Sequence, residues 1–165
     1  MKVNNFFKLV IAIAVSELAG VIGSVFTISA IPNWYTGLVK PALNPPAWVF
    51  GPAWTTLYAL MGISLFLVWK QHSHILKNVG MLRMWKIGIA AFFVQLSLNA
   101  VWSIIFFGLQ NPGWALVDII LLWLAIVWTI IVFYKISKLA AYLLLPYLLW
   151  VSFASYLNYS IWMLN

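Results

Sequence analysis

The chain contains no cysteine and only two acidic residues, Glu17 and Asp118, among its 165 residues. The missing cysteines exclude disulfides, thiolate metal sites and cysteine nucleophiles. Two isolated carboxyls form no catalytic pair, and the sequence contains no nucleophile-elbow, zinc-protease or phosphate-loop motif. Conventional acid–base, nucleophilic or metal-assisted hydrolysis therefore has no machinery here, and neither a metal site nor a required cofactor is expected.

Charge is also scarce, because only 7% of the residues are charged while 65% are hydrophobic and the mean hydropathy is +1.04. A soluble domain carries about 25% charged residues, so this chain cannot cover a water-facing surface. The composition predicts an integral membrane protein in contact with the lipid bilayer. The net charge of +7 does not indicate a nucleic-acid partner, because the cations cluster at the ends of apolar runs, where membrane topology places them.

Five segments reach the length of about 20 apolar residues that a membrane-spanning helix needs. They cover approximately residues 6–30, 47–69, 84–107, 113–134 and 139–162. The sequence therefore predicts an all-α integral membrane fold, with residues 1–165 forming a single five-helix domain. We expect a long Pro-rich first loop over 31–46, a polar second loop over 70–83, and two tight turns. His72 and His74 lie in that second segment, where a solvated loop is favoured over a metal site.

The cations divide unequally between the two ends of these five spans. One end carries Lys2, Lys8, Lys70, Lys77, Arg83, Lys86, Lys135 and Lys138, and the other carries Lys40. Because cationic loops remain in the cytoplasm, we expect a cytoplasmic N-terminus, with the first loop and the C-terminus outside. The protein is expected to be multi-pass, in a bacterial cell membrane.

The stretch from Trp34 to Trp54 contains four prolines, three tryptophans and one tyrosine. Proline fixes φ and removes a backbone donor, so this loop is expected to be stiff. A rigid aromatic lid beside a helix bundle favours a binding site for a flat or apolar ligand. The remaining aromatic residues near span ends fit an interfacial belt, formed by Trp34, Tyr35, Trp48, Trp114 and Trp162 outside and by Trp69 and Trp85 inside.

Four tryptophans lie too deep for such a belt, at positions 54, 102, 123 and 150. Helical spacing places three polar and aromatic stripes on shared faces, formed by Gly51, Trp54, Thr55, Tyr58 and Gly62, by Gln95, Asn99, Trp102 and Phe106, and by Trp150, Ala154 and Asn158. Amide side chains turn away from lipid. Periodicity alone leaves two interpretations equally open, namely a cavity beneath the first loop and tight interhelical packing.

Glu17 lies in the middle of the first span, with no Lys or Arg at its depth. A carboxyl in this setting is expected to be protonated and to donate a hydrogen bond. It is a functional candidate, and the alternative is a structural hydrogen bond to a neighbouring helix. Ser16, Gly20 and Ser24 on the same span form a small-residue surface that suits either a dimer face or an internal seam.

The order of these residues resembles the TspO/translocator-protein family, the tryptophan-rich sensory proteins that include the peripheral benzodiazepine receptor. The resemblance covers nearly the whole chain. It rests on Gly23-Ser24, on the run from Trp34-Tyr35 through Lys40-Pro41, Pro45-Pro46, Gly51-Pro52 and Trp54 to Tyr58, on Gln95, Asn99, Trp102 and Phe106-Phe107-Gly108, on Gly113-Trp114 and Asp118, and on Pro146-Tyr147, Trp150 and Asn158-Tyr159.

The resemblance implies a five-helix bundle, commonly a homodimer, with a ligand pocket under the first loop. It implies a receptor or translocator with a sensory or stress role that binds tetrapyrroles such as protoporphyrin IX and haem, and isoquinoline or benzodiazepine drugs. With Trp102 from the stripe analysis, the expected ligand-binding residues are Tyr35, Pro45, Trp54, Asn99, Trp102, Trp150 and Ala154.

The resemblance also leaves an enzymatic alternative, because some family members are reported to degrade protoporphyrin in light and oxygen. Trp54 and Trp150 are the catalytic candidates for such a reaction. Sterol binding is not expected, because Met163 stands where the family's recognition pattern has a cation.

Overall fold

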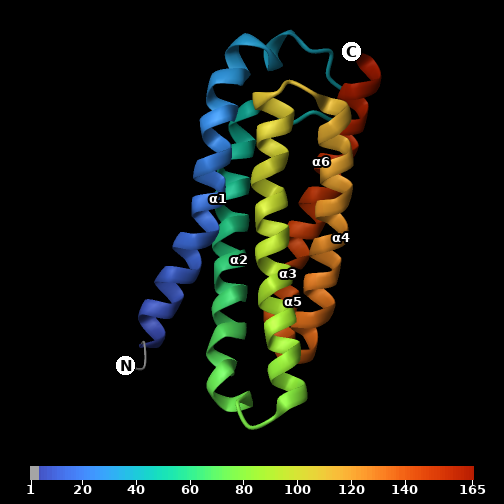
Figure 1. Ribbon diagram of the computed structural model, residues 1–165. Coiled ribbons are helices and arrows are strands. Elements are labelled where there is room, and N and C mark those ends of the chain that lie inside the picture. The colour runs from blue at the N-terminus through green and yellow to red at the C-terminus, as the bar shows by residue number, and fades with distance from the viewer. Residues whose placement is uncertain (1–3) are drawn as a thin grey trace.

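The structure is a computed structural model that describes residues 4–165, which form a bundle of long helices (Figure 1). The elements are α1 (Asn5–Asn33), the 3₁₀ turn η1 (Tyr35–Gly37), α2 (Ala47–Ile75), α3 (Val79–Ser103), the π-helical turn η2 (Ile104–Gly108), α4 (Pro112–Ile136), α5 (Lys138–Leu143) and α6 (Leu145–Leu164). Five helical segments are long and apolar enough to cross a membrane, with α3–η2 and α5–α6 each forming one of them. The predicted five-span, all-α membrane fold is confirmed.

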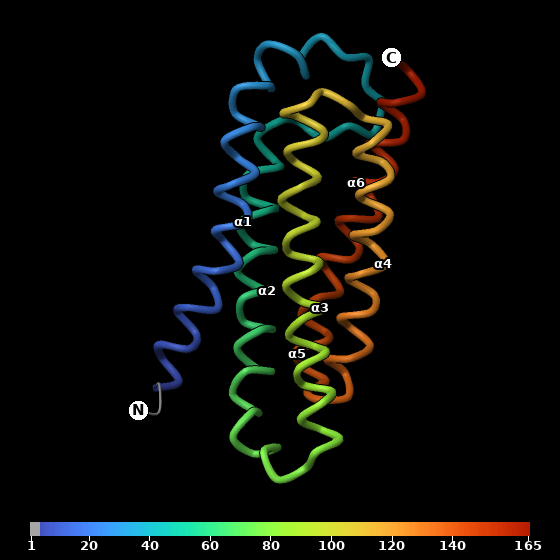
Figure 2. Tube along the Cα trace, in the orientation of Figure 1, coloured from blue at the N-terminus to red at the C-terminus, as the bar shows by residue number. Residues whose placement is uncertain are grey.

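The helices run side by side along one axis, as the tube in Figure 2 shows most clearly. The first loop and the C-terminus lie at one end of the bundle, and the α2–α3 turn lies at the other, towards the N-terminus. α1 packs against α2 and α3, and α4 packs against α3 and α6. The cations expected on one side lie at the end with the α2–α3 turn; of these, Lys2 falls outside the described residues.

The expected second loop over 70–83 is wrong, because α2 continues to Ile75 and α3 already begins at Val79. The true connection is a short turn, which Asn78 ends by accepting a hydrogen bond from the Met81 backbone N–H at 3.0 Å. The polar residues lie on helical extensions instead. His72 lies within α2, and its ring centre is 4.6 Å from that of Trp85.

The fifth span was expected to be one continuous helix over 139–162, but it is interrupted at Leu144. Pro146 stands in the first turn of α6 and has no N–H to continue the hydrogen-bond ladder of α5. Leu144 closes α5 by donating its backbone N–H to Ala141 at 3.1 Å. The proline thus redirects the chain before the face that carries Trp150.

Small residues bring the helices together in the half of the bundle farther from the first loop. A Cβ added at Gly62 would lie 2.5 Å from the Ile13 Cα, and one at Gly88 would lie 3.1 Å from Val132. Ser64, which is fully buried, donates a hydrogen bond of 2.7 Å to the Ala140 carbonyl. This half is close-packed, which leaves the other half for a cavity.

The small-residue surface of α1 is an internal seam. Ser16 is fully buried, and a Cβ at Gly20 would lie 2.4 Å from the Tyr58 ring of α2. One turn further, a Cβ at Gly23 would lie 2.8 Å from the Ser103 hydroxyl of α3. These positions therefore pack within the chain and are not available as a dimer face.

Candidate functional site

A cavity of about 560 Å³ occupies the half of the bundle that lies beneath the first loop. Its walls come from α1, η1, α2, the α3–η2 junction and α6. Aromatic side chains dominate the lining and are contributed by Tyr35, Trp48, Phe50, Trp54, Tyr58, Trp102, Phe106, Phe107 and Trp150. Both interpretations left open by the sequence apply, because Trp54, Trp102 and Trp150 line the cavity while Asn99 and Gly62 of the same stripes pack between helices.

The tryptophans on α2 and α6 contact each other in one wall of the cavity. The ring centres of Trp54 and Trp150 are 6.4 Å apart, and the planes are nearly perpendicular at 86°. Trp54 also stacks on Tyr58 of its own helix at 5.6 Å, with an interplanar angle of 27°. Each ring is held by neighbours on two helices, which fixes the orientation of this wall.

The opposite wall is shaped by the π-helical turn η2. Its wider turn lets two consecutive residues, Phe106 and Phe107, both line the cavity. Trp102 stacks on Phe106 at 5.0 Å and 23°. Gly108 ends the turn where α1 comes close, since a Cβ there would lie 2.8 Å from the Phe26 ring.

The first loop is held in place by side-chain hydrogen bonds. Tyr35 donates to the Asn44 amide oxygen at 2.9 Å, and Asn44 in turn donates to the Pro45 carbonyl at 3.1 Å. Burial raises the pKa of Tyr35 above its usual value, although the bond to Asn44 partly opposes this. The phenol therefore remains a donor at neutral pH. The Lys40 ammonium lies 4.8 Å from the Tyr35 ring centre.

The C-terminus is attached to the same loop. Asn165 accepts a hydrogen bond from the Val39 backbone N–H at 3.0 Å and donates to the Val39 carbonyl at 3.1 Å. Lys40 donates to the carbonyls of Thr36 and Leu38, at 3.2 and 3.0 Å. The lid over the cavity is thus cross-linked to α6, and the Lys40 ammonium has its own backbone partners.

Below the cavity lies a buried polar layer that joins three helices. Tyr58 of α2 donates to the Asn99 side-chain oxygen of α3, and Asn99 donates to the Tyr147 hydroxyl of α6 at 3.0 Å. All three residues are at most 6% exposed. Because Tyr58 also lines the cavity, this layer forms its floor.

A second buried amide holds one of the cavity-lining tryptophans in place. Asn158 accepts a hydrogen bond from the Trp102 indole at 2.9 Å and donates to the Pro112 carbonyl at 2.7 Å. The indole N–H of Trp150, in contrast, is buried and has no hydrogen-bond partner among residues 4–165. The indoles of Trp102 and Trp150 therefore differ, because the first donates a hydrogen bond within the protein and the second has no partner among the described residues.

The structure brings most of the expected ligand-binding residues together. Tyr35, Trp54, Trp102, Trp150 and Ala154 all line the cavity. Pro45 and Asn99 do not, because Pro45 belongs to the loop network and Asn99 lies behind Tyr58 in the floor.

Other positions differ from the sequence analysis. Trp123 is deep but lies away from the cavity, and its indole donates to Ser152 at 2.9 Å, so it links α4 to α6. Tyr35, expected in the outer belt, is only 9% exposed and lines the cavity. Tyr147 and Phe107 were quoted in the resemblance but not assigned roles; helical spacing could not have identified Phe107, which depends on the π-helical turn.

Glu17 also lines the cavity and is half-buried. The neighbouring α1 side chains of Ser16, Ser24 and Thr27 donate to carbonyls of their own helix. Within the described part of the chain, no hydrogen bond links Glu17 to another helix, so the structural bond given as the alternative to a functional role is not formed.

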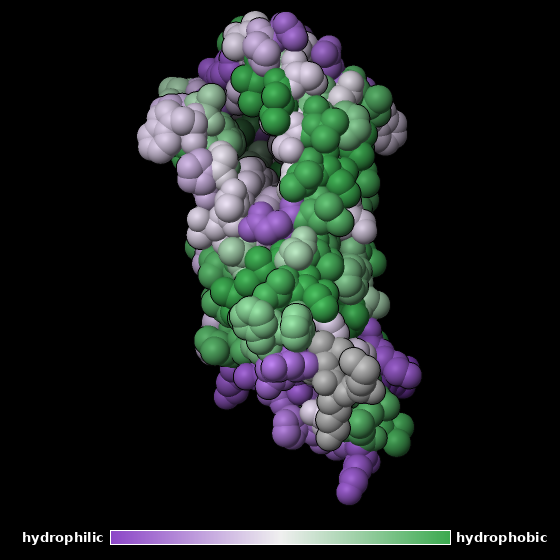
Figure 3. Space-filling model, turned by 90° about the vertical axis from the view of Figure 1, so that its left-hand side faces the viewer, coloured by the Kyte–Doolittle hydropathy of each residue, from purple (hydrophilic) through white to green (hydrophobic). Residues whose placement is uncertain are grey.

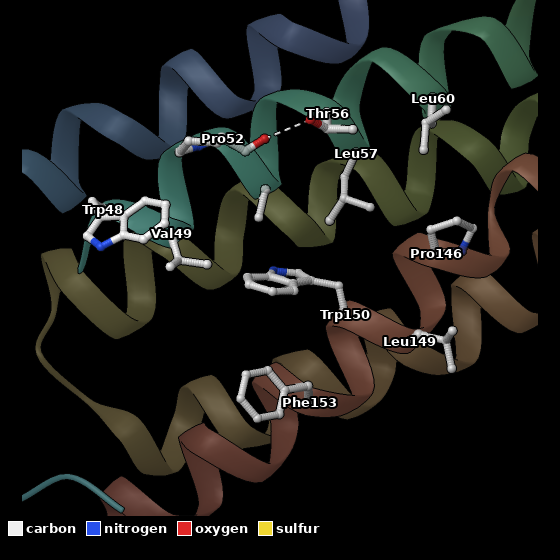
Figure 4. Close-up of a pocket in the computed structure, with 11 residues that line it drawn as sticks. Trp48, Val49, Pro52, Thr56, Leu57, Leu60, Pro146, Leu149, Trp150 and Phe153 are labelled. Atoms are coloured by element: carbon white, nitrogen blue, oxygen red, sulfur yellow. Dashed lines mark hydrogen bonds between the residues drawn. The ribbon is translucent and has the colours of Figure 1, made fainter. Parts of the chain in front are cut away.

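Outside the cavity, an apolar groove of about 660 Å³ runs between α2 and α6 (Figure 4). Its walls include Pro52, Leu60, Leu149 and Phe153, and the Trp150 indole reaches across it from α6 towards α2. Trp150 lines both the groove and the cavity. Its side chain therefore stands between the interior space and the lipid-facing surface at this point.

Comparison with known proteins agrees with this architecture. A sequence model of the TspO/MBR family matches residues 12–163. The chain is 48% identical over 161 residues to the tryptophan-rich protein TspO of Archaeoglobus fulgidus, covering 98% of this chain and 99% of the relative. It is 42% identical to the human translocator protein over 141 residues, or 86% of this chain and 80% of the relative.

A third relative is the tryptophan-rich sensory protein of Cereibacter sphaeroides, which is 35% identical over 133 residues. That alignment covers 81% of this chain and 77% of the relative. The matches therefore extend over the helices, the first loop and the cavity walls together. This chain is a multi-pass membrane protein that belongs to the TspO/MBR family.

Proposed function

We propose that this protein is a membrane receptor with a sensory role that binds tetrapyrroles, such as protoporphyrin IX and haem, in the cavity beneath the first loop. Related flat apolar molecules, including isoquinoline and benzodiazepine compounds, are further candidate ligands. The observation that carries the proposal is the aromatic lining, in which Trp54, Trp102 and Trp150 line one cavity from three different helices.

The size and chemistry of the cavity support a flat ligand. A volume of about 560 Å³ falls within the range of about 300–1,000 Å³ that is typical of small-molecule sites. Perpendicular rings such as those of Trp54 and Trp150 offer one face and one edge to a planar π-system.

The protein's placement in the membrane is part of the same proposal. Lys70, Lys77 and Lys138 belong to the cationic end of the bundle, which we assign to the cytoplasm of a bacterial cell. The first loop and the cavity then lie towards the outside. We further propose a homodimer, whose interface lies elsewhere than the Ser16–Gly20 seam.

The enzymatic alternative, light- and oxygen-dependent degradation of protoporphyrin, is not favoured. It would use the same two residues, Trp54 and Trp150, so the geometry of the cavity gives no separate support for turnover. The names of the relatives, tryptophan-rich sensory protein and translocator protein, fit a receptor role better than an enzymatic one.

The test is titration of the purified protein in lipid nanodiscs with protoporphyrin IX, followed by porphyrin absorbance and corrected with empty nanodiscs. We expect Trp54→Phe to weaken binding by up to about tenfold, because the stacking term is about 0.5–1.5 kcal/mol. Trp114→Phe is the matched control, because Trp114 is 68% exposed and absent from the cavity. Equal affinities of the two variants and the wild type would refute the proposed site.

The same samples also test the alternative. Protoporphyrin bound to the wild type is illuminated with and without oxygen, and its absorbance is followed over time. A receptor leaves the pigment at the rate seen with empty nanodiscs. Oxygen-dependent loss that Trp150→Phe abolishes without abolishing binding would instead establish degradation.

A further inference from the structure

The cavity contains one acidic group, the carboxyl of Glu17. Of the α1 residues that line the cavity, Glu17 is the one farthest along the chain from the first loop. The end of the cavity beneath the lid is aromatic, with Tyr35, Trp48 and Phe107. The two ends of the cavity thus differ in chemistry.

No protein group satisfies this carboxyl within the described residues. Gly20, one turn further along α1, packs directly against the Tyr58 ring, but the Tyr58 hydroxyl already donates to Asn99. Residues 4–165 place no lysine or arginine in the cavity lining. A carboxyl at membrane depth without a protein partner is costly, so a ligand group that pairs with Glu17 would add to the affinity of the cavity.

The position of Glu17 makes such a partner accessible. Gly51 and Thr55 of α2 line the cavity and are exposed, as is Val21 of α1, so the cavity opens sideways between these helices. Figure 3 shows a hollow in the upper half of this face, with hydrophilic surface at its lower rim, hydrophobic surface on its right and paler surface of intermediate hydropathy on its left. A ligand held in the cavity can therefore reach the carboxyl.

We propose that Glu17 is a subsite for a basic nitrogen carried by a flat aromatic ligand. This rests on the proposed function of the cavity and adds a charge preference to it. The rings occupy the aromatic space beneath the first loop, beside Trp54 and Trp150, and the nitrogen lies against Glu17. A neutral amine that enters takes the carboxyl proton, which leaves an ammonium and a carboxylate joined by a charge-assisted hydrogen bond.

The experiment compares two probes that differ in one group, 9-(aminomethyl)anthracene and 9-ethylanthracene. Both are titrated into the protein in phosphatidylcholine nanodiscs, with anthracene fluorescence as the signal and empty nanodiscs subtracted. We expect the wild type to prefer the amine by about tenfold or more, from the strength of a hydrogen bond between charged groups. Glu17→Gln is expected to remove the preference, so that this variant binds the two probes with equal affinity.

Two further variants keep the result interpretable. Glu17→Asp retains the carboxyl on a shorter side chain and is expected to keep part of the preference. Asp118→Asn removes the other acidic group, which is buried in α4 outside the cavity lining, and is expected to keep all of it. Helicity measured by circular dichroism confirms that each variant is folded.

The outcomes separate this subsite from the function on which it rests. A wild type with no preference for the amine, or a Glu17→Gln variant that retains it, would overturn the subsite even if protoporphyrin IX binds normally. A wild type that binds neither anthracene nor protoporphyrin IX would overturn the proposed function, and the subsite with it.

Discussion

The hydrogen-bonded floor of the cavity permits a sharp test of what stabilises this bundle. Asn99 joins the hydroxyls of Tyr58 and Tyr147, and all three residues are buried. Asn99→Leu preserves the approximate shape of the side chain but removes the amide, so both tyrosine hydroxyls lose their hydrogen-bond partner. We expect the variant to fold and to be less stable than the wild type.

The magnitude follows from two competing estimates. In water-soluble proteins, each polar group left buried without a partner costs about 1–3 kcal/mol. Hydrogen bonds between membrane helices are worth less, about 0.6 kcal/mol on average and about 1.7 at most, because the unfolded chain in lipid also finds partners. The membrane value is appropriate here, so loss of the two bonds by Asn99→Leu should lower the free energy of unfolding by about 1–3 kcal/mol.

Gln95 provides a matched control on the same helix. It lies one turn from Asn99 and is 1% exposed, yet neither atom of its amide group has a hydrogen-bond partner among residues 4–165. Gln95→Leu removes an unpaired amide and is expected to be neutral or slightly stabilising. Both amides are buried, but only that of Asn99 is hydrogen-bonded. The difference between the two changes in unfolding free energy therefore measures the contribution of the hydrogen bonds separately from that of burial.

The measurement is reversible unfolding in mixed micelles with increasing sodium dodecyl sulfate, followed by circular dichroism. A mutant cycle is formed by also introducing Asn99→Leu into a Tyr58→Phe/Tyr147→Phe background, in which both hydroxyls are absent. There the cost should fall below about 0.5 kcal/mol, because no hydroxyl is left unpaired. An equal cost in both backgrounds, or an equal cost for Gln95→Leu, would refute the assignment of stability to these bonds.

Two further predictions concern packing and topology. Gly20→Ala should lower the free energy of unfolding by about 1–2 kcal/mol in the same assay, because its Cβ would overlap the Tyr58 ring. The control is Gly51→Ala, which should be neutral or stabilising because nothing lies within 4 Å of the added Cβ. A larger loss for Gly51→Ala than for Gly20→Ala would contradict this packing. In intact cells, a cysteine at Asn165 should react with an impermeant thiol reagent and one at Lys77 should react only after permeabilisation; the opposite pattern would invert the orientation.

The sequence predicted the five spans because each apolar run has the length that hydrocarbon demands. It underestimated the helices at the cationic end of the bundle, where α2 and α3 extend into the predicted loop 70–83. Hydropathy reports where a segment leaves the lipid, and a helix can continue into water beyond that point. The real end is fixed by a local signal, the Asn78 cap that binds the Met81 N–H.

The cavity could be predicted only in part. Helical periodicity placed Trp54, Trp102 and Trp150 on inward faces, but the same spacing fits both a packed core and a cavity. Asn99 and Asn158 illustrate the limit, since both are buried amides on predicted stripes. One bonds two tyrosines beneath the cavity and the other anchors the Trp102 indole. To choose between these roles, one must know how three helices are displaced relative to one another along the bundle axis. Residue spacing within one helix does not give this information.

The distribution of small and large residues explains why the bundle is closed in one half and hollow in the other. At Gly62 and Gly88 the side chain is absent, so neighbouring helices approach closely. Nearer the first loop, α2 and α6 face each other with indoles, and the edge-to-face contact of Trp54 with Trp150 holds these two backbones apart. The cavity is thus a consequence of ring size at facing positions.

The floor and the side of this cavity differ in stiffness. The floor is cross-linked through Asn99 to α2 and α6, whereas the opening between α1 and α2 is bordered by Gly51 and Thr55, whose only side-chain hydrogen bond is local to α2. Work done by a bound ligand would therefore deform the α1 side before the floor. The deformation is limited to the opening itself, because α1 and α2 are in close contact at Gly20 and Gly62.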